Sequence, residues 1–327
     1  MHSGVEQAGK NTKPARIGVA LSSGGGRGVF AHTGFLLALE KLGIDVAAIA
    51  GCSAGALVGG IYASGTDLHR WSKRIIEART REYWSPDSWP RLYWNMIVRK
   101  GRGYNGLSDT LAALGFIQEN LTAKSFEECK IPFYCLALNL SKNSKEIFSE
   151  GDLAPRIMAS AAMPVLYRPV LIGGEWYSDG ATIELAPTEA ICCKHKLDAL
   201  VVHHAAGHRK GSGALAWTQK QPWSLLQLLN LLLYRQRPWY LSEQPLTFHR
   251  CPGGCGAPII VIEPDLPELT WPLNTGGAEI QNTSMIQALS LLQAFADQLK
   301  TNPDKLFSSF PETISEPPLH GVKCNGK

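Results

Sequence analysis

The sequence predicts an α/β protein with a mainly parallel central sheet between helices, a three-layer α/β/α arrangement. Two consecutive units near the N-terminus predict it, because each combines a short apolar run, a glycine-rich turn and a helical spacing of apolar residues. Consecutive strand–turn–helix units pair their strands in parallel through right-handed crossovers. Apolar runs later in the chain supply further buried strands for the same sheet.

The first unit has an expected strand at Ile17–Leu21 and an expected helix over Val29–Leu42. In the second unit, a strand at Asp45–Ala50 leads through the turn Gly51–Gly55 into a small-residue helix that includes Ala56, Leu57, Ile61 and Tyr62. We expect the later strands at Pro132–Asn139, Ala199–His203 and Pro258–Ile262, and a last helix over Glu279–Leu299.

The composition is that of an ordinary globular protein. The chain has 327 residues, 45% hydrophobic and 18% charged, with a formal net charge of +4, which gives no support to nucleic-acid binding. No apolar run of about 18 residues and no secretory signal is visible, so we expect a cytoplasmic protein with at most a peripheral membrane contact. Eight irregularly spaced cysteines predict reduced thiols.

The chain divides by composition into a polar tail (1–15), a main domain (16–207), a C-terminal part packed on the same domain (208–302) and a loose tail (303–327). The main domain carries an insertion at 70–104, where Arg70 to Arg102 holds nine Arg or Lys, three acids and several Trp and Tyr residues. An apolar, aromatic helix is expected at 223–240. These two segments fit either a face that docks on anionic bilayers, or a lid or oligomer interface.

The pattern G-x-S-x-G spans Gly51, Cys52, Ser53, Ala54 and Gly55, between an expected strand and an expected helix. This context is typical of a nucleophile elbow, in which the turn strains the serine backbone and leaves no room for side chains at the glycines. Ser53 would then lie at a helix N-terminus, which favours developing negative charge. The alternative is a small-residue turn with a packing role only.

A second glycine-rich loop follows the first strand and comprises Ser23, Gly24, Gly25, Gly26, Arg27 and Gly28. Acyl transfer needs N–H donors that converge on a tetrahedral oxyanion, and glycines let the backbone approach that closely. A nucleotide phosphate loop is the competing interpretation, but the Lys-Ser/Thr pair of such loops is absent.

The base for Ser53 has two kinds of candidate in the sequence. One is Asp179 in the stretch Ser-Asp-Gly-Ala that continues to Gly180 and Ala181; the others are His203, His204 and His208 after a later strand. The order Ser, Asp, His suits an α/β-hydrolase triad. In that fold, however, the elbow follows a central strand well into the domain, whereas here it follows the second strand.

Over about Arg16 to Gly207 the chain resembles the patatin-like phospholipase family. The resemblance rests on the loop Gly24–Gly28, the elbow at Ser53, the stretch Ala159–Pro164 and the triplet Asp179-Gly180-Ala181. It implies the patatin-like fold and a Ser/Asp dyad without histidine, placed on Ser53 and Asp179, with the oxyanion hole at Gly24, Gly25, Gly26 and Arg27. Ser23 departs from the family, whose loop commonly begins with glycine.

A carboxylate is an inefficient base toward a serine hydroxyl unless desolvation raises its pKa. We therefore expect an apolar pocket around Asp179, proton transfer from Ser53, an acyl-enzyme, and activation of water by the same carboxylate. The resemblance implies a lipid esterase or phospholipase A that acts at a lipid surface without a cofactor. Acyl transfer to another acceptor and a non-catalytic regulator are the rival hypotheses.

Cysteines near the C-terminus raise a further alternative. His249, Cys251 and Cys255 lie close together, and Cys192-Cys193 lies elsewhere in the chain. A zinc site is therefore conceivable, but the C-x₃-C spacing has no matching second pair. The sequence prediction is a bent loop with no metal.

Overall fold

The computed structural model describes residues 14–205, 238–242, 244–267 and 276–313, with the single positions 224, 228 and 269. Its strands are β1 (Ile17–Leu21), β2 (Val46–Cys52), β3 (Gly106–Ser108), β4 (Phe133–Asn139), β5 (Ser144–Phe148), β6 (Val165–Tyr167), β7 (Val170–Ile172), β8 (Glu175–Asp179), β9 (Ala199–His203), β10 (Leu246–Arg250) and β11 (Pro258–Ile262).

The α-helices of the described residues are α1 (Gly25–Lys41), α2 (Ala54–Ala63), α3 (Leu68–Glu77), α4 (Thr80–Tyr83), α5 (Trp89–Tyr93), α6 (Leu111–Asn120), α7 (Leu153–Ala161), α10 (Gly277–Leu292), α11 (Ala296–Thr301) and α12 (Leu306–Ser309). A π-helical turn, η1 (Trp94–Val98), follows α5. Short 3₁₀ turns are η2 (Gly180–Thr182), η3 (Thr188–Ala190), η4 (Gln293–Phe295) and η5 (Pro303–Lys305).

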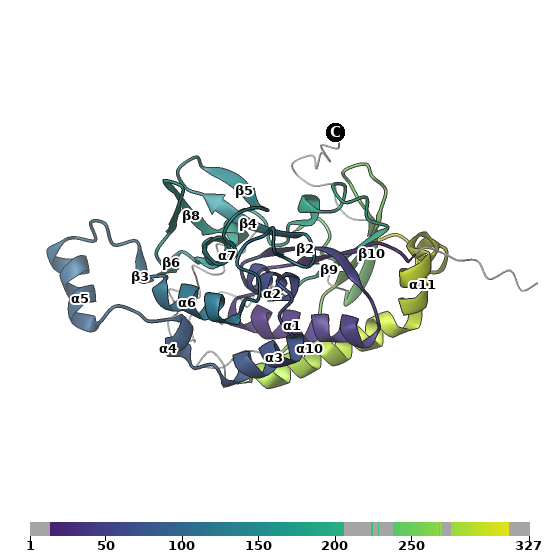
Figure 1. The fold of residues 1–327 in the computed structure, drawn as a ribbon, viewed down its shortest axis with the longest axis horizontal. Helices are drawn as coiled ribbons and strands as arrows, with labels where there is room; N and C mark the ends of the chain where they lie inside the picture. The colour runs from purple at the N-terminus through teal and green to yellow at the C-terminus, as the bar shows by residue number, and fades with distance from the viewer. Residues whose placement is uncertain are drawn as a thin grey trace, which may run out of the picture.

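One sheet organises the described residues (Figure 1). Its strand order is β10-β11-β9-β1-β2-β4-β8-β7, with β5 paired to β4, while β3 and β6 form a separate pair. The five central strands from β11 to β4 are parallel, and antiparallel strands extend both ends. The predicted α/β fold class, with its mainly parallel centre, is confirmed.

The two faces of the sheet are covered differently. Helices α1, α2, α7 and α10 cover one face, where inward residues of β1 such as Val19 join the main core. The other face carries Leu200 and Val202, which pack with Ile191 and Tyr240. Within the described residues this second covering layer includes the segment after β8, with its 3₁₀ turns.

The predicted elements agree closely where apolar runs are fully buried. The strands β1, β9 and β11 match their predicted bounds. The first helix begins at Gly25 rather than Val29, so part of the glycine-rich loop forms its first turn. The last predicted helix is interrupted at η4, because Phe295 turns to pack edge-on against two aromatic rings, Phe248 and Phe310.

The predicted insertion at 70–104 consists of two different parts. Helix α3 belongs to the core, since Trp71 is 1% exposed and its ring N–H donates to the Thr33 hydroxyl at 3.0 Å. The apolar face of this helix packs on α1. Beyond Ser85 the chain projects from the body of the molecule as α5 and η1 (Figure 1).

The expected loose tail is wrong for residues 303–313. Leu306 is fully buried, the Phe310 ring stacks on Phe248 with centroids 4.7 Å apart, and the Thr313 N–H donates to the Phe248 carbonyl at 2.7 Å. Apolar side chains in a Pro- and Ser-rich stretch are thus enough to fix it on the sheet edge.

Two predictions fall largely on residues outside those described. They are the helix at 223–240, of which only positions 224, 228 and 238–240 are described, and His208. In the described part of the chain, no helix combines the length and the apolar character that crossing a membrane requires.

Candidate active site

Ser53 occupies a strained turn between β2 and α2. Its backbone has φ 55° and ψ −116°, which L-residues rarely adopt. The flanking glycines permit this turn: a Cβ on Gly51 would lie 2.2 Å from the Gly55 carbonyl oxygen, and a Cβ on Gly55 would lie 2.3 Å from the Leu21 carbonyl oxygen. The sequence therefore folds here as the G-x-S-x-G pattern predicts.

Asp179 is the side chain that meets Ser53. Its Oδ2 accepts a hydrogen bond from the Ser53 hydroxyl at 2.6 Å. The sheet makes this contact, because β4 pairs Leu136 with Cys52 of β2 and Ala137 with Asp179 of β8. Two residues 126 positions apart in the chain are thus held two strands apart in the sheet.

Burial controls the chemistry of Asp179. The residue is 1% exposed, and desolvation raises the pKa of its carboxyl from 3.8 to about 6, against hydrogen bonds from Ser53 and the Ala181 N–H that lower it. The Ala181 N–H donates to Oδ1 at 2.9 Å, so each carboxylate oxygen has a donor. Gly180 is required for this approach, since a Cβ there would lie 2.4 Å from the Leu136 carbonyl oxygen.

The C-terminal end of α7 positions both residues of this pair. The Ser160 hydroxyl accepts from the Ser53 N–H at 3.0 Å and donates to the Leu136 carbonyl at 2.6 Å. The Ala162 carbonyl accepts from the Asp179 N–H at 3.1 Å. Ser160 was not among the predicted site residues, although its stretch belongs to the resemblance; nothing local in the sequence distinguishes its hydroxyl from other serines.

The first turn of α1 lies beside the serine turn. A Cβ on Gly28 would lie 3.0 Å from the Cβ of Ala54, the residue after Ser53. The first intrahelical bond runs from the Gly28 N–H to the Gly24 carbonyl at 2.9 Å. The N–H groups of Gly25, Gly26 and Arg27 therefore have no acceptor one turn earlier in the helix, and they form a donor cluster near the start of α2.

The alternative histidine bases have other partners. The Nδ1 atoms of His203 and the buried His32 are 2.7 Å apart, and the His203 ring stacks on Phe35 with centroids 4.3 Å apart. His204 Nδ1 is 3.2 Å from the Tyr240 hydroxyl. Burial lowers the pKa of His203 well below its usual value. Neither ring is hydrogen-bonded to Ser53, and His208 lies outside the described residues.

Comparison with known proteins places the chain in a family. A family model described as patatin-like phospholipase matches residues 19–191, more than half of the 327 residues. The chain belongs to the patatin-like phospholipase family. The matched region contains the serine turn, the glycine-rich first turn of α1 and Asp179.

Curated relatives match about half of this chain. An uncharacterized NTE family protein of Mycobacterium tuberculosis is 28% identical over 184 residues, which cover 56% of this chain and 47% of the relative. Lysophospholipase NTE1 of Cryptococcus neoformans is 29% identical over 182 residues, which cover 54% of this chain and 10% of the fungal protein. The chain thus spans about half the length of its mycobacterial relatives.

Two solved structures are similar over most of the chain. VipD from Legionella pneumophila has a TM-score of 0.48 at 16% identity, covering 86% of this chain and 68% of the other. Human GIVD cytosolic phospholipase A2 has a TM-score of 0.49 at 10% identity, covering 87% of this chain and 62% of the other.

Proposed function

We propose that this protein is a serine hydrolase of lipid carboxylic esters, with Ser53 as the nucleophile and Asp179 as its base. One observation carries the proposal: a serine in a strained turn donates its hydroxyl proton to a fully buried carboxylate at 2.6 Å. A raised carboxyl pKa brings Asp179 closer to the proton affinity that a general base needs near neutral pH. Family membership and a lysophospholipase relative support the substrate class.

In the acylation step, the Ser53 proton passes to Asp179 Oδ2 while Oγ bonds to the ester carbonyl carbon. The carbonyl π electrons move to its oxygen, and the C–O bond to the leaving alcohol then breaks, with the alcohol oxygen taking the proton from Asp179. In the second step a water gives a proton to the same carboxylate and attacks the acyl-enzyme. Ser53 recovers its proton as the free acid leaves.

The oxyanion of both steps is assigned to the first turn of α1. The N–H groups of Gly25, Gly26 and Arg27 are not used within the helix, and the turn contacts Ala54. The positive end of the α1 dipole adds to the stabilisation of the developing charge. Ala54 begins α2, so its own N–H is also free of an intrahelical acceptor.

Contact with the lipid surface is assigned to the projection at α5 and η1. Trp89 is 76% exposed, and Tyr93, Trp94, Met96, Ile97 and Val98 are each about half exposed or more. Basic residues lie within and just after this apolar group in the chain: Arg91, Arg99, Lys100 and Arg102. Aromatic side chains beside Arg and Lys suit the interface of an anionic bilayer, where apolar rings enter the headgroup region and the charges pair with phosphates.

Salt bridges fix the start of the projecting segment to the body of the protein. Asp87 pairs with Arg168 and with Arg91, the latter at 3.3 Å, and its N–H donates to the Leu107 carbonyl at 2.8 Å. The exposed apolar surface is therefore carried on an anchored segment rather than on a free tail.

The test of the proposal combines two readouts. Wild type, Ser53→Ala and Asp179→Asn are incubated with vesicles of phospholipid and lysophospholipid, and released fatty acid is measured. A fluorophosphonate probe with intact-mass detection reports whether Ser53 is nucleophilic even where the vesicle lipid is not the natural substrate. The proposal expects labelled wild type and loss of at least about a thousandfold in rate for both variants. A folded wild type without labelling at Ser53 contradicts it.

The membrane contact has its own test. The double variant Trp89→Ser/Trp94→Ser is expected to bind anionic vesicles more weakly in a flotation assay, while hydrolysis of a soluble short-chain ester is unchanged. Trp176→Ser is the matched control, because Trp176 is 47% exposed on β8, outside the projection. Equal vesicle binding by wild type and the double variant would exclude this role.

A further inference from the structure

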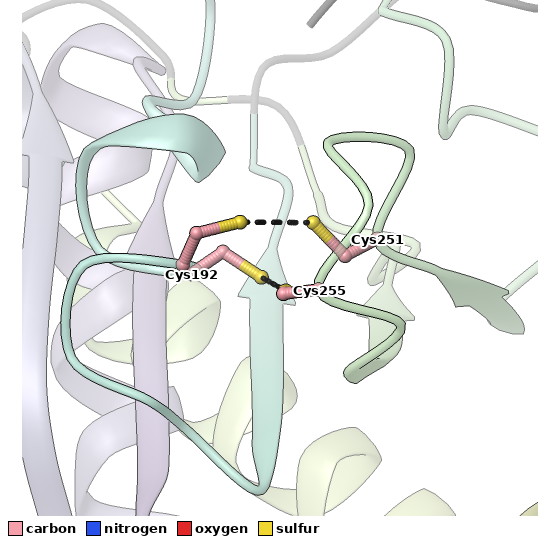
Figure 2. A group of neighbouring side chains, drawn as sticks. Cys192, Cys251 and Cys255 are labelled. Atoms are coloured by element: carbon pink, nitrogen blue, oxygen red, sulfur yellow. Dashed lines mark hydrogen bonds between the residues drawn. The ribbon is translucent and has the colours of Figure 1, made fainter. Parts of the chain in front are cut away.

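Four cysteines from two distant segments meet in one cluster. Cys192 and Cys193 lie between η3 and β9, and Cys251 and Cys255 lie in the turn from β10 to β11. Their Sγ atoms all lie within 4.8 Å of one another. The Cys192–Cys255 and Cys193–Cys251 Sγ distances are both 3.7 Å, and Figure 2 shows Cys192, Cys251 and Cys255 directed toward one another.

The sulfur spacing is that of a tetrahedral metal site. A zinc ion bound to four thiolates at about 2.3 Å places the sulfurs about 3.8 Å apart, the edge of the tetrahedron. A disulfide requires about 2.05 Å. Two pairs at 3.7 Å, with all four atoms mutually close, match the first arrangement. The structure also supplies what the sequence lacked, since Cys192-Cys193 is the second pair for the C-x₃-C turn.

The turn that carries Cys251 and Cys255 is shaped to present sulfur. Its glycines adopt positive φ, 95° at Gly254 and 68° at Gly256, which wraps the chain tightly. Backbone hydrogen bonds close the turn: the Cys251 N–H donates to the Ala257 carbonyl at 3.0 Å, and the Gly254 N–H donates to the Cys251 carbonyl at 3.4 Å. These bonds fix the backbone that carries the two cysteines.

Charge near the cluster also fits a metal–thiolate group. Zinc with four thiolates has a net charge of −2, and the basic residue Arg250 directly precedes Cys251. The Arg250 guanidinium donates to the Gly256 carbonyl at 2.9 Å, so its charge lies against the turn. His249 is not part of the cluster; its Nε2 is 2.9 Å from the Thr247 hydroxyl.

We propose that Cys192, Cys193, Cys251 and Cys255 form a structural zinc site. The cluster lies at the opposite end of the sheet from Ser53. The β10–β11 turn lies beyond the paired residues Arg250 and Pro258, at the edge of the sheet where the parallel strands β11 and β9 begin. Ser53 follows the end of the parallel strand β2, at the other edge. Zinc there joins the β10–β11 edge of the sheet to the segment that enters β9. Four protein ligands close the coordination sphere, as in structural sites, and leave no position for a substrate.

The redox state of Cys193 determines when the fourth ligand is present. Cys193 is disulfide-bonded, so the sequence prediction of reduced thiols is wrong at this residue. Thiols are present at Cys52, Cys129, Cys135, Cys192, Cys251 and Cys255. A dithiol reductant cleaves the bond by exchange, giving two protein thiols and an oxidised, cyclic reductant. The four cluster thiols then release their protons as zinc binds.

The experiment uses the full chain, reduced with a dithiol, stripped of metal with a chelator, and then given zinc or cobalt(II). We expect one zinc per chain by elemental analysis and native mass spectrometry. The cobalt form should show thiolate-to-metal charge transfer and the intense d–d bands of tetrahedral geometry. Zinc should raise Tm by about 5 °C or more. Cys255→Ser, at an exposed position, should lose the metal and the shift in Tm.

Two controls separate this site from other thiols and from the proposed esterase. Cys129→Ser should bind zinc as wild type does, because the Cys129 Sγ contacts the Ser125 carbonyl at 3.6 Å, outside the cluster. Ser53→Ala should also keep its zinc. Absence of zinc from reduced wild type, or equal zinc in Cys255→Ser, overturns the site. So does the appearance of Cys192–Cys255 and Cys193–Cys251 disulfides in preference to metal when reduced protein and zinc are mixed in air.

Discussion

The hydroxyl of Ser160 accepts a hydrogen bond from the backbone N–H of Ser53 at 3.0 Å. This contact ties the serine turn to the C-terminal end of α7, and the same hydroxyl continues to the Leu136 carbonyl of β4 at 2.6 Å. The Ser53 N–H is therefore engaged within the protein. An oxyanion has to find its donors elsewhere, which is consistent with the role proposed for the first turn of α1.

Ser160→Ala should lower the rate of ester hydrolysis about tenfold without changing KM. The substitution leaves the buried Ser53 N–H and Leu136 carbonyl without this partner, at a cost of about 1–3 kcal/mol, and loosens the turn that aims Oγ. Ser178→Ala is the control, because its hydroxyl donates to the Ala162 carbonyl at 2.8 Å and does not touch Ser53. Rates of fluorophosphonate labelling measure the effect; equal rates in the two variants would contradict the positioning role.

Hydrolysis of a soluble ester should decline as pH falls through about 6. Asp179 must be ionised to accept the Ser53 proton, and desolvation has raised the pKa of its carboxyl to about 6. A kcat/KM profile of the free enzyme between pH 4 and 9 should thus show its acidic limb near that value, well above the limb of an exposed carboxylate at about 4. A limb near pH 4 would mean that water reaches Asp179.

Asp179→Asn should stabilise the protein at pH 8 while abolishing hydrolysis. The folded state holds the Asp179 proton more tightly than the unfolded state, so wild-type stability declines as pH rises from about 4 to about 6 and stays lowered above that. A shift of about two pKa units corresponds to a loss of folding stability of about 3 kcal/mol at most. The uncharged amide of the Asn variant avoids this loss. The gain, measured by urea denaturation at pH 8, should vanish near pH 4. A variant less stable than wild type at pH 8 would contradict the desolvation cost.

Gly55→Ala should prevent folding or inactivate the protein, whereas Gly115→Ala should be neutral or stabilising. A methyl group at Gly55 would lie 2.3 Å from the Leu21 carbonyl oxygen, and the backbone cannot yield without moving Ser53. Gly115, inside α6, has no atom within 4 Å of its added Cβ, so alanine there should gain about 0.5–1 kcal/mol. Soluble yield and Tm of the two variants give the comparison.

Strand prediction succeeded where a short apolar run is buried on both faces and bounded by turn residues, as at β1, β9 and β11. It missed β5, whose polar residues are partly exposed, and β8, whose short polar segment is buried at Ser178 and Asp179; both lie at the antiparallel side of the sheet. Such strands lack both the apolar run and a clean alternation, so pairing with β4 decides them. Most of helix α3 was assigned to the insertion because the whole stretch from Arg70 to Arg102 is rich in Arg and Lys, although Trp71 and Ile75 face the interior.

The sequence by itself determined the serine turn, and it offered Asp179 and three histidines as candidate bases. The turn is a local feature, because a positive-φ serine between glycines needs only neighbouring residues. Only the tertiary structure decided that Asp179, and neither His203 nor His204, is hydrogen-bonded to Ser53. The same holds for the joining of Cys192 and Cys193 to Cys251 and Cys255. Both contacts depend on strand order and register, which bring together side chains that are far apart in the chain.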